Sequence, residues 1–260
     1  MPDVLYEQDG HIGTITLNRP ERMNAISGEM LTGLTNLLRQ CDEDADVRCM
    51  ILTGAGRGFC AGLDLKDQSS GQGLDFDGGG GGAVKVGDTP PFILRRIDTP
   101  VLCALNGPAA GYGMDLALGC DIVIASDLAK FACPVRRGVV PESGGTWILP
   151  RLVGWQKASE IILLARTLDA QSILELGLAN RVVPHDDVMR TARSWASELA
   201  ANAPLAVSAA KRSMRLGLDT PFEANALHVM AELMQLFRTR DFAEGLKSFM
   251  EKRDPKYEGR

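Results

Sequence analysis

Two carboxylates lie close to glycine-bearing turns in the middle of the chain, where they could move protons to and from a bound ligand. Asp115 follows the turn at 111–113, and Glu142 stands between Pro141 and a run of small residues. A carboxyl group held in a sparsely solvated turn can have a raised pKa and act as a general base or acid. The residues alone also allow structural roles, because a negative charge is favoured near a helix start and glutamate usually faces solvent.

Backbone amides are a second possible source of chemistry. Residues 56–66 read GRGFCAGLDLK and residues 106–121 read NGPAAGYGMDLALGCD, and each segment follows an apolar run. A turn after a strand can direct successive N–H groups at one point, and small residues let a ligand approach the backbone. A helix that begins there presents unpaired donors, which suit a carbonyl oxygen that gains negative charge. Taken singly, each segment also fits an ordinary turn between a strand and a helix.

The patterning around these turns predicts an α/β architecture. Alternation predicts strands at 4–7 and 11–17, and short apolar runs predict strands at 47–52, 101–105 and 121–126.

The predicted helices lie between these strands and in the last third of the chain. Ser27 is the expected N-cap of a helix whose apolar face begins at Met30. From about residue 155 we expect mainly helices, including one that starts with a capping box at 220–223 and an amphipathic one near 240–252. The glycine-rich segment 67–89 is expected to be a mobile surface loop.

Composition limits the class of protein. The chain has 260 residues, 45% of them hydrophobic and 23% charged, which suits one large domain or one domain with a helical appendage. A net charge of -5 argues against nucleic acid as the main partner. No run of about 20 apolar residues is present, so we expect no membrane partner.

Six cysteines without a CxxC pair, and no signal-peptide pattern, favour free thiols in the cytoplasm. The three histidines have no metal-ligand spacing.

Taken together, the motifs resemble the enoyl-CoA hydratase/isomerase (crotonase) family. The resemblance rests on the segments 56–66 and 106–121, on GVVPESGGT at 138–146 and on LNRPERMNAIS at 17–27, and it runs from about residue 4 to 252. It implies an acyl-CoA enzyme, such as those of fatty acid metabolism, that stabilises a thioester enolate in an oxyanion hole and acts on the double bond of an enoyl-CoA.

The resemblance also implies a fold and an assembly. We expect a spiral of ββα units in an α/β core at 1–200 and a C-terminal helical region at 201–260. That region would join the chains into a homotrimer or a dimer of trimers. The coenzyme A thioester is the substrate, and no other cofactor and no metal is implied.

Individual residues receive roles from the same resemblance. The N–H groups of Leu63 and Tyr112 would form the oxyanion hole. Coenzyme A would be held by residues in the first quarter of the chain and by two near its C-terminal end, which in relatives often reach it from a neighbouring subunit: Arg22, Met23, Ala61, Gly62, Phe249 and Lys252.

The carboxylates depart from the family's usual hydratase pattern. One hydratase glutamate falls at Asp115, whose side chain is shorter by ~1.5 Å. The second belongs to a Phe-x-x-Pro-Glu motif that here reads FACPV at 131–135, so Pro134 or Val135 takes its place and cannot transfer a proton. Glu142 resembles the carboxylate of some enoyl-CoA isomerases, and its pairing with Asp115 resembles that of dienoyl-CoA isomerases. The residues therefore slightly favour isomerisation, whereas hydration is the commoner activity of the family.

Two other interpretations stay open on the sequence. The missing glutamate is compatible with a non-catalytic acyl-CoA-binding subunit. The same scaffold also supports thioester hydrolysis, decarboxylation or dehalogenation, because the enolate is common to all of them.

Overall fold

The centre of the larger sheet is formed by two apolar runs of the sequence. In this computed structural model, which describes residues 1–64 and 86–260, every residue of β3 (Cys49–Gly54) and β4 (Val101–Leu105) is buried. A parallel strand covered on both faces requires such a run. Met50 and Leu52 join the main core on one face, while Cys49 and Ile51 pack on the other face beneath α8.

Nine strands form two sheets in the described parts of the chain. The larger sheet has the order β1-β2-β3-β4-β6-β9; its β1–β2 pair is antiparallel and its other pairs are parallel. The smaller sheet has the order β5-β7-β8. The remaining strands are β1 (Val4–Asp9), β2 (Ile12–Leu17), β5 (Ala109–Ala110), β6 (Ile122–Ser126), β7 (Lys130–Ala132), β8 (Thr167–Asp169) and β9 (Arg181–Val183).

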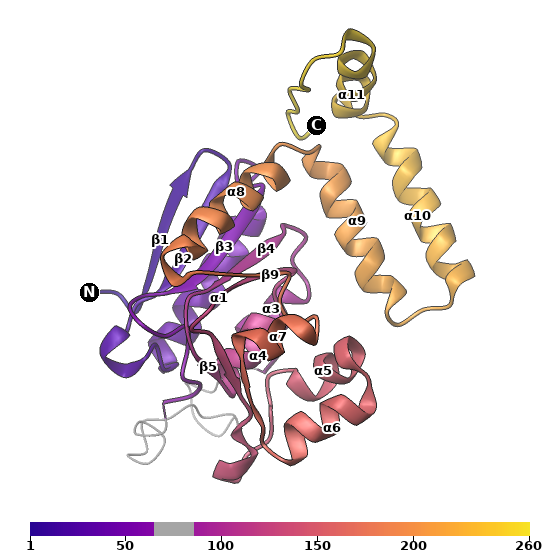
Figure 1. Ribbon diagram of the computed structural model, residues 1–260. Helices are drawn as coiled ribbons and strands as arrows, with labels where there is room; N and C mark the ends of the chain where they lie inside the picture. The colour runs from indigo at the N-terminus through magenta and orange to yellow at the C-terminus, as the bar shows by residue number, and fades with distance from the viewer. Residues whose placement is uncertain (65–85) are drawn as a thin grey trace.

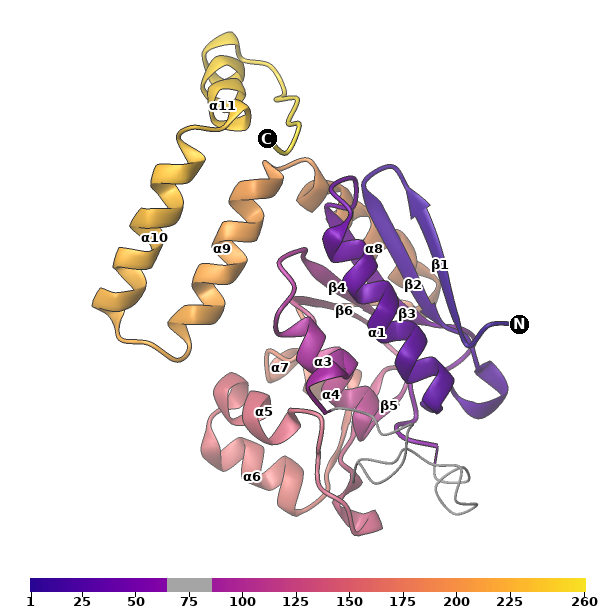
Figure 2. The same ribbon diagram turned by 180° about the vertical axis from the view of Figure 1, so that it is seen from behind.

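Helices cover both faces of the larger sheet and then leave it. Helix α8 lies over one face (Figure 1), and α1 and α3 lie over the other (Figure 2). The helices are α1 (Gly28–Glu43), α3 (Pro90–Leu94), α4 (Tyr112–Leu118), α5 (Gly145–Val153), α6 (Trp155–Leu163), α7 (Ala170–Glu175), α8 (Val188–Ala200), α9 (Pro204–Gly217), α10 (Phe222–Leu236) and α11 (Arg240–Glu251), with short 3-10 turns at Pro20–Arg22, Val86–Asp88, Pro134–Arg137 and His185–Asp187.

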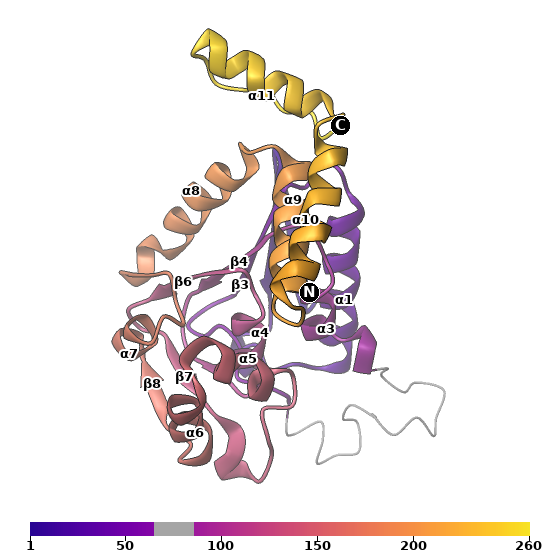
Figure 3. The ribbon, with the colours of Figure 1, turned by 90° about the vertical axis from the view of Figure 1, so that its right-hand side faces the viewer.

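The last three helices project from the part of the chain that carries the sheets. Helices α9 and α10 run side by side, and α11 lies at their far end (Figures 1 and 3). Charged side chains fasten this region to the core: Lys211 Nζ lies 2.7 Å from Asp121 Oδ2, and Arg212 pairs with both Asp98 and, on α10, Glu232. The predicted helical region after residue 200 is therefore present.

Several expectations about local structure are confirmed and others are wrong. Ser27 caps α1, since its Oγ accepts a hydrogen bond from Met30 N at 3.0 Å. The predicted capping box is wrong: Pro221 is the N-cap of α10, and the Thr220 hydroxyl donates instead to Leu216 O. The first turn lies at 10–11, not at 9–10, because Asp9 pairs with Ile12.

Two further differences concern the segments outside these helices. Strands β8 and β9 interrupt the stretch that was expected to be helical, and β9 forms an edge of the larger sheet. The predicted loop 67–89 lies outside the described residues up to position 85, and its last part forms the 3-10 turn Val86–Asp88 and Thr89, the N-cap position of α3. Within the described residues, no helix is long and apolar enough to cross a membrane.

Candidate active site

The turn after β3 is held in place by two asparagine side chains. Asn24, fully buried, donates from Nδ2 to Ala55 O (2.9 Å) and Gly58 O (2.8 Å). Asn106, which follows β4, donates from Nδ2 to Gly56 O and Gly58 O and accepts from Gly54 N. The two amides therefore satisfy the carbonyl groups of a loop that makes few backbone hydrogen bonds of its own.

The same turn is joined to the glycine turn before α4. Ala110 N donates to Cys60 O at 2.9 Å, and Cys60 and Ala109 form an isolated parallel bridge. Gly62 has a φ of +96°, and a Cβ there would lie 2.8 Å from Ala110 O and 3.6 Å from Tyr112 N. The lack of a side chain at Gly62 thus allows the two turns to meet and keeps the space before Tyr112 N open.

Leu63 and Tyr112 carry backbone N–H groups that make no hydrogen bond within the described parts of the chain. Ile26 N donates to Gly62 O, and Asp64 N donates to Ile26 O, so Leu63 lies between these bonds with its own N–H turned away from Ile26. Tyr112 is the first residue of α4, where a helix leaves its N–H free. The structure therefore brings the two predicted donors onto adjoining turns.

Asp115 lies on α4 and is completely buried. Burial chiefly, with a smaller contribution from the nearby charge of Glu142, raises the pKa of its carboxyl group to about 7, although the Ser143 and Gly145 amides oppose the shift. Ser143 N donates to Oδ2 at 3.0 Å, whereas no described residue forms a well-aligned hydrogen bond with Oδ1. Asp115 is therefore a carboxyl group that can hold or release a proton near neutral pH.

Glu142 lies in the turn before α5 and is exposed, in contrast to the expectation of a sparsely solvated position. Protein atoms around its carboxyl group nevertheless raise its pKa by desolvation, partly offset by its own backbone N–H. Because the side chain is exposed, water reaches its carboxyl group and screens it. Glu142 thus faces solvent beside the buried Asp115, whose pKa its charge raises.

The Tyr112 side chain lies in the hydrophobic core next to these carboxyl groups. Its ring is buried, and burial, with the nearby Cys60, Glu142 and Asp115, raises the pKa of the phenol well above its usual value. Tyr112 therefore remains a neutral phenol, and its hydroxyl has no hydrogen-bond partner among the described residues.

The residues predicted to hold coenzyme A fall into two separate places. Met23 lies against the first turn, since its carbonyl accepts from Ala61 N at 2.9 Å and its Sδ lies 3.1 Å from Arg57 Nε. Arg22 is exposed beside it, and Ala61 O accepts no hydrogen bond within the described residues. These residues and Gly62 are therefore brought together with the two predicted donors.

Phe249 and Lys252 are not brought to this site. They lie on and directly after α11, at the end of the molecule opposite α4 and β5 (Figure 1). Phe249 is 83% exposed.

Sequence reasoning missed the two asparagines and the role of Arg19. The Arg19 guanidinium lies 3.2 Å from Asp64 Oδ2, which ties the segment before Asn24 to the turn that carries Leu63. The residue type of Asn24 was itself a signal. Its φ is 55°, and asparagine tolerates a positive φ better than most residues do.

Solved structures place this arrangement in a known class. The crystal structure of an enoyl-CoA hydratase from Mycobacterium tuberculosis H37Rv superposes with a TM-score of 0.90 at 34% sequence identity, covering 100% of both chains. Two sheets of ββα units with a projecting helical region are the crotonase fold, as predicted.

Comparisons of sequence give the family. The model of the enoyl-CoA hydratase/isomerase family matches residues 7–260. The 1,2-epoxyphenylacetyl-CoA isomerase of Escherichia coli (strain K12) is 37% identical over 100% of both chains, and the short-chain-enoyl-CoA hydratase of Clostridium acetobutylicum is 33% identical over 96% of this chain and 95% of its own. The chain belongs to the enoyl-CoA hydratase/isomerase family and is an acyl-CoA enzyme of the lyase/isomerase class.

Proposed function

We propose that the protein is an enoyl-CoA isomerase, which moves the carbon–carbon double bond of an enoyl thioester by proton transfer. The observation that carries this proposal is the pairing of Asp115 with Glu142, while Pro134 or Val135 takes the place of the second hydratase glutamate. The Val135 side chain cannot transfer a proton. Its neighbour Pro134 lies beside the glycine turn, with its Cβ 3.5 Å from where a Cβ on Gly111 would be.

The proposed reaction begins with polarisation of the thioester carbonyl. The free N–H groups of Leu63 and Tyr112 would donate to its oxygen, and they stabilise an enolate most when they lie about 2.7–3.1 Å from it. This lowers the cost of removing the proton next to the carbonyl. Gly62, without a side chain, leaves room for that oxygen before Tyr112 N.

The two carboxyl groups would then share the proton transfers. Glu142, whose side chain is exposed, would remove the proton from the carbon next to the carbonyl. The electrons form a dienolate, and a proton returns at the γ-carbon to give the conjugated enoyl thioester. Asp115, with a pKa of about 7, can supply or accept a proton at neutral pH. Only protons move, so the reaction needs no cofactor besides the coenzyme A of the substrate.

The experiment compares 3-enoyl-CoA and crotonyl-CoA as substrates for the purified protein. Formation of the conjugated enoyl from the first, faster than loss of conjugation from the second, supports isomerisation. Glu142→Gln should lower the isomerisation rate about 10²–10⁴-fold. Glu198→Gln, an exposed glutamate on α8, is the matched control and should keep the rate. Acyl-CoA binding without turnover on either substrate would instead favour a binding subunit.

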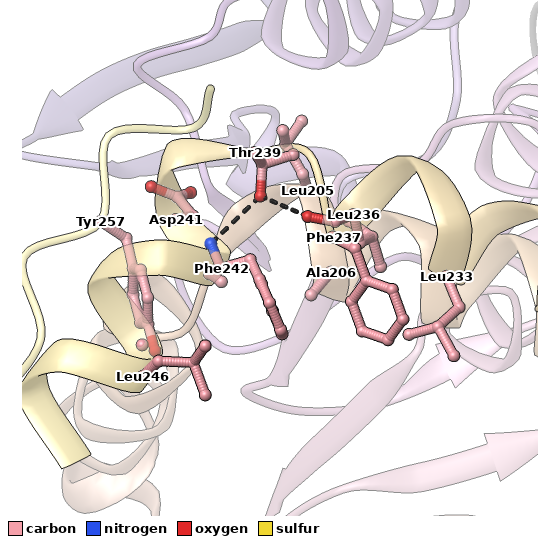
Figure 4. A pocket seen from close by; sticks show the side chains of 12 residues that line it. Leu205, Ala206, Leu233, Leu236, Phe237, Thr239, Asp241, Phe242, Leu246 and Tyr257 are labelled. Atoms are coloured by element: carbon pink, nitrogen blue, oxygen red, sulfur yellow. Dashed lines mark hydrogen bonds between the residues drawn. The ribbon is translucent and has the colours of Figure 1, made fainter. Parts of the chain in front are cut away.

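The proposal includes a homotrimer or a dimer of trimers built through α9–α11. Helix α10 contains no buried residue, and its apolar side chains include Leu227 at 74% and Met230 at 53% exposure. An apolar cavity of about 300 Å³ lies between α9, α10 and α11. In Figure 4 Phe237 and Phe242 lie side by side at this cavity, with ring centroids 4.8 Å apart. Such a surface suits burial against other copies of the chain.

A trimer would also give Phe249 and Lys252 a place in coenzyme A binding. Because α11 lies far from α4 of its own chain, these residues would reach the ligand held by a neighbouring subunit. A cytoplasmic location completes the proposal and is supported by the six cysteines, all of which are free thiols.

A further inference from the structure

A second concave site lies at the end of α4 opposite to the turn that carries Tyr112. It is a cavity of about 270 Å³ between α3, the C-terminal end of α4, α5 and α9. Apolar side chains form much of its wall: Leu94, Leu118, Ile148, Leu152, Met214 and Leu218. In the single chain Leu152, Met214 and Leu218 are each more than half exposed, so the rim of the cavity is apolar.

Two guanidinium groups stack on one indole ring in this cavity. Arg95 Cζ lies 4.2 Å and Arg151 Cζ 3.8 Å from the ring centre of Trp147. Such cation–π contacts orient a guanidinium but leave its N–H donors free for another acceptor. The Arg95 side chain makes no hydrogen bond or ion pair with any residue in the described ranges.

The other charges around the cavity are already engaged. Lys211 is paired with Asp121 at 2.7 Å and also donates to a backbone carbonyl, and Arg215 is paired with Asp98 at 2.9 Å. Both belong to α9. These pairs use their charge within the protein and leave the Arg95 guanidinium without a neighbour of opposite sign in contact.

Arg151 Nη1 donates to Trp147 O at 3.1 Å, and the same guanidinium lies 4.0 Å from Asp219 at the surface. Burial lowers the pKa of Arg95; Asp219 opposes the shift, and the positive charges of Arg215 and Arg151 add to it. The cation is thus held where its charge is disfavoured, and a bound anion would relieve both the desolvation and the repulsion.

We propose that this cavity binds a carboxylate carried on a short apolar stem, with the Arg95 guanidinium donating to the carboxylate and Trp147 and the apolar wall holding the stem. Arginine is suited to this because its planar fork can donate two parallel hydrogen bonds to one carboxylate. The apolar entrance and wall favour such a ligand over a strongly hydrated inorganic anion.

The cavity is connected to the candidate active site through the first turn of α5. Gly145 of that turn packs against Asp115, and Trp147 and Ile148 follow on the same short helix. The carboxylate could therefore come from two sources: a free organic acid, or the far end of the acyl chain of a thioester bound at the active site. The binding of the free acid does not depend on the proposed isomerisation.

The first experiment measures binding of hexanoate, with hexanol as the uncharged control of equal stem length. The full-length protein carries Trp155→Phe and Trp195→Phe, so that its fluorescence reports Trp147 alone. Hexanoate should change the fluorescence saturably and hexanol should not. Arg95→Gln should weaken hexanoate binding at least about tenfold, and Arg95→Lys, which keeps the charge, should weaken it less. Thermal unfolding confirms that each variant is folded.

Arg96→Gln is the matched control. Its guanidinium lies over Phe92 at 6.0 Å and donates to Gly87 O, away from the cavity. It should bind hexanoate as the parent protein does. Equal responses to hexanoate and hexanol, the absence of saturation, or an equal loss in the Arg96 and Arg95 variants would overturn the proposal.

A second experiment separates the two sources. Two enoyl-CoA esters of equal chain length, one ending in a carboxylate and one in a methyl group, are compared with the parent protein and Arg95→Gln. If the acyl chain supplies the carboxylate, Arg95→Gln lowers kcat/KM for the first ester relative to the second at least about tenfold, and hexanoate competes with it. If the ligand is a free acid, that ratio stays the same. Should neither ester react, the isomerase proposal fails while the hexanoate result stands.

Discussion

Gly145 and Asp115 pack so closely that a Cβ at position 145 would lie 2.1 Å from Asp115 Oδ1 and 2.9 Å from the carboxyl carbon, Asp115 Cγ. No side chain other than that of glycine fits this contact, because real Cβ atoms do not approach other heavy atoms so closely. The contact allows the start of α5 to lie directly on α4. It also places the Ser143 amide 3.0 Å from Oδ2 of a fully buried carboxyl group.

Replacing Gly145 with alanine should therefore damage both stability and activity. The new methyl group would have to displace Asp115 or the first turn of α5, so we expect a loss of about 1–3 kcal/mol in the free energy of unfolding. A carboxyl group displaced by even about 1 Å should lower kcat/KM roughly 100-fold. Chemical denaturation and the isomerase assay measure the two effects.

The control for this variant is Gly33→Ala. Gly33 lies within α1, and a Cβ there would meet only Val4, at 3.6 Å. Alanine in a helix interior is favoured over glycine by up to about 1 kcal/mol, so this variant should be as stable as the parent or more so. A Gly145→Ala protein that keeps the parent's stability and rate would show that the packing described here is wrong.

The buried Asp115 should make stability depend on pH in a direction opposite to that of a salt-bridged carboxylate. Its pKa rises from 3.8 in the unfolded chain to about 7 in the folded protein. The folded state therefore binds more protons between these values, and this contribution is present below pH ~4 and lost as the pH rises to ~7.

Asp115→Asn removes this dependence. Above pH 7 the variant should be more stable than the parent by roughly 2–4 kcal/mol, and below pH 4 the two should be alike. Thermal unfolding in buffers on either side of this window measures the difference. A variant that is less stable than the parent at high pH would mean that the carboxylate is stabilised in its charged form by contacts other than the Ser143 and Gly145 amides.

Much of the fold could be predicted because long segments carry strong periodicity. The apolar spacing after Ser27 predicted α1, and the uninterrupted apolar run at 101–105 predicted the central strand β4. Strands β8 and β9 were missed because each is only three residues long, which is too short for a period of two to be recognised. Thr220 has the residue type of a helix cap, but its hydroxyl bonds to the preceding helix instead.

The sequence could predict which residues belong to the site, but it could not predict how deeply their side chains are buried. The resemblance of the two glycine-bearing segments to the family indicated Leu63 and Tyr112 as the backbone donors, because the motifs that carry it are local in the sequence. The difference between the buried Asp115 and the exposed Glu142 depends on how α5 packs on α4, which no local pattern encodes. The contact of Arg95 with Trp147 likewise joins α3 and α5 only in the folded chain.

The exposed face of α10 leads to a prediction about assembly. Leu227→Glu combined with Met230→Glu places two charges on neighbouring turns of one helical face, where the proposed interface would bury them. Light scattering should give three or six times the chain mass of 28.0 kDa for the parent and one chain for the double variant. Leu128→Glu, a leucine 58% exposed on the sheet-bearing part, should leave the assembly intact. A parent protein with the mass of one chain would contradict the proposed trimer.

Val135 offers a test of why isomerisation is proposed over hydration. It is half-buried in the 3-10 turn Pro134–Arg137, next to the glycine turn that leads to Tyr112. Val135→Glu would add a third carboxylate, where the second hydratase glutamate would stand. Loss of conjugation in crotonyl-CoA should then rise at least about tenfold over the parent, because a positioned base contributes about 10²–10⁴-fold when its geometry is ideal. Val140→Glu, at a valine 62% exposed in the same segment, should bring no such gain. If the parent already hydrates crotonyl-CoA as fast as it isomerises a 3-enoyl-CoA, a carboxylate at position 135 is not what separates the two reactions, and Asp115 with Glu142 must suffice for both.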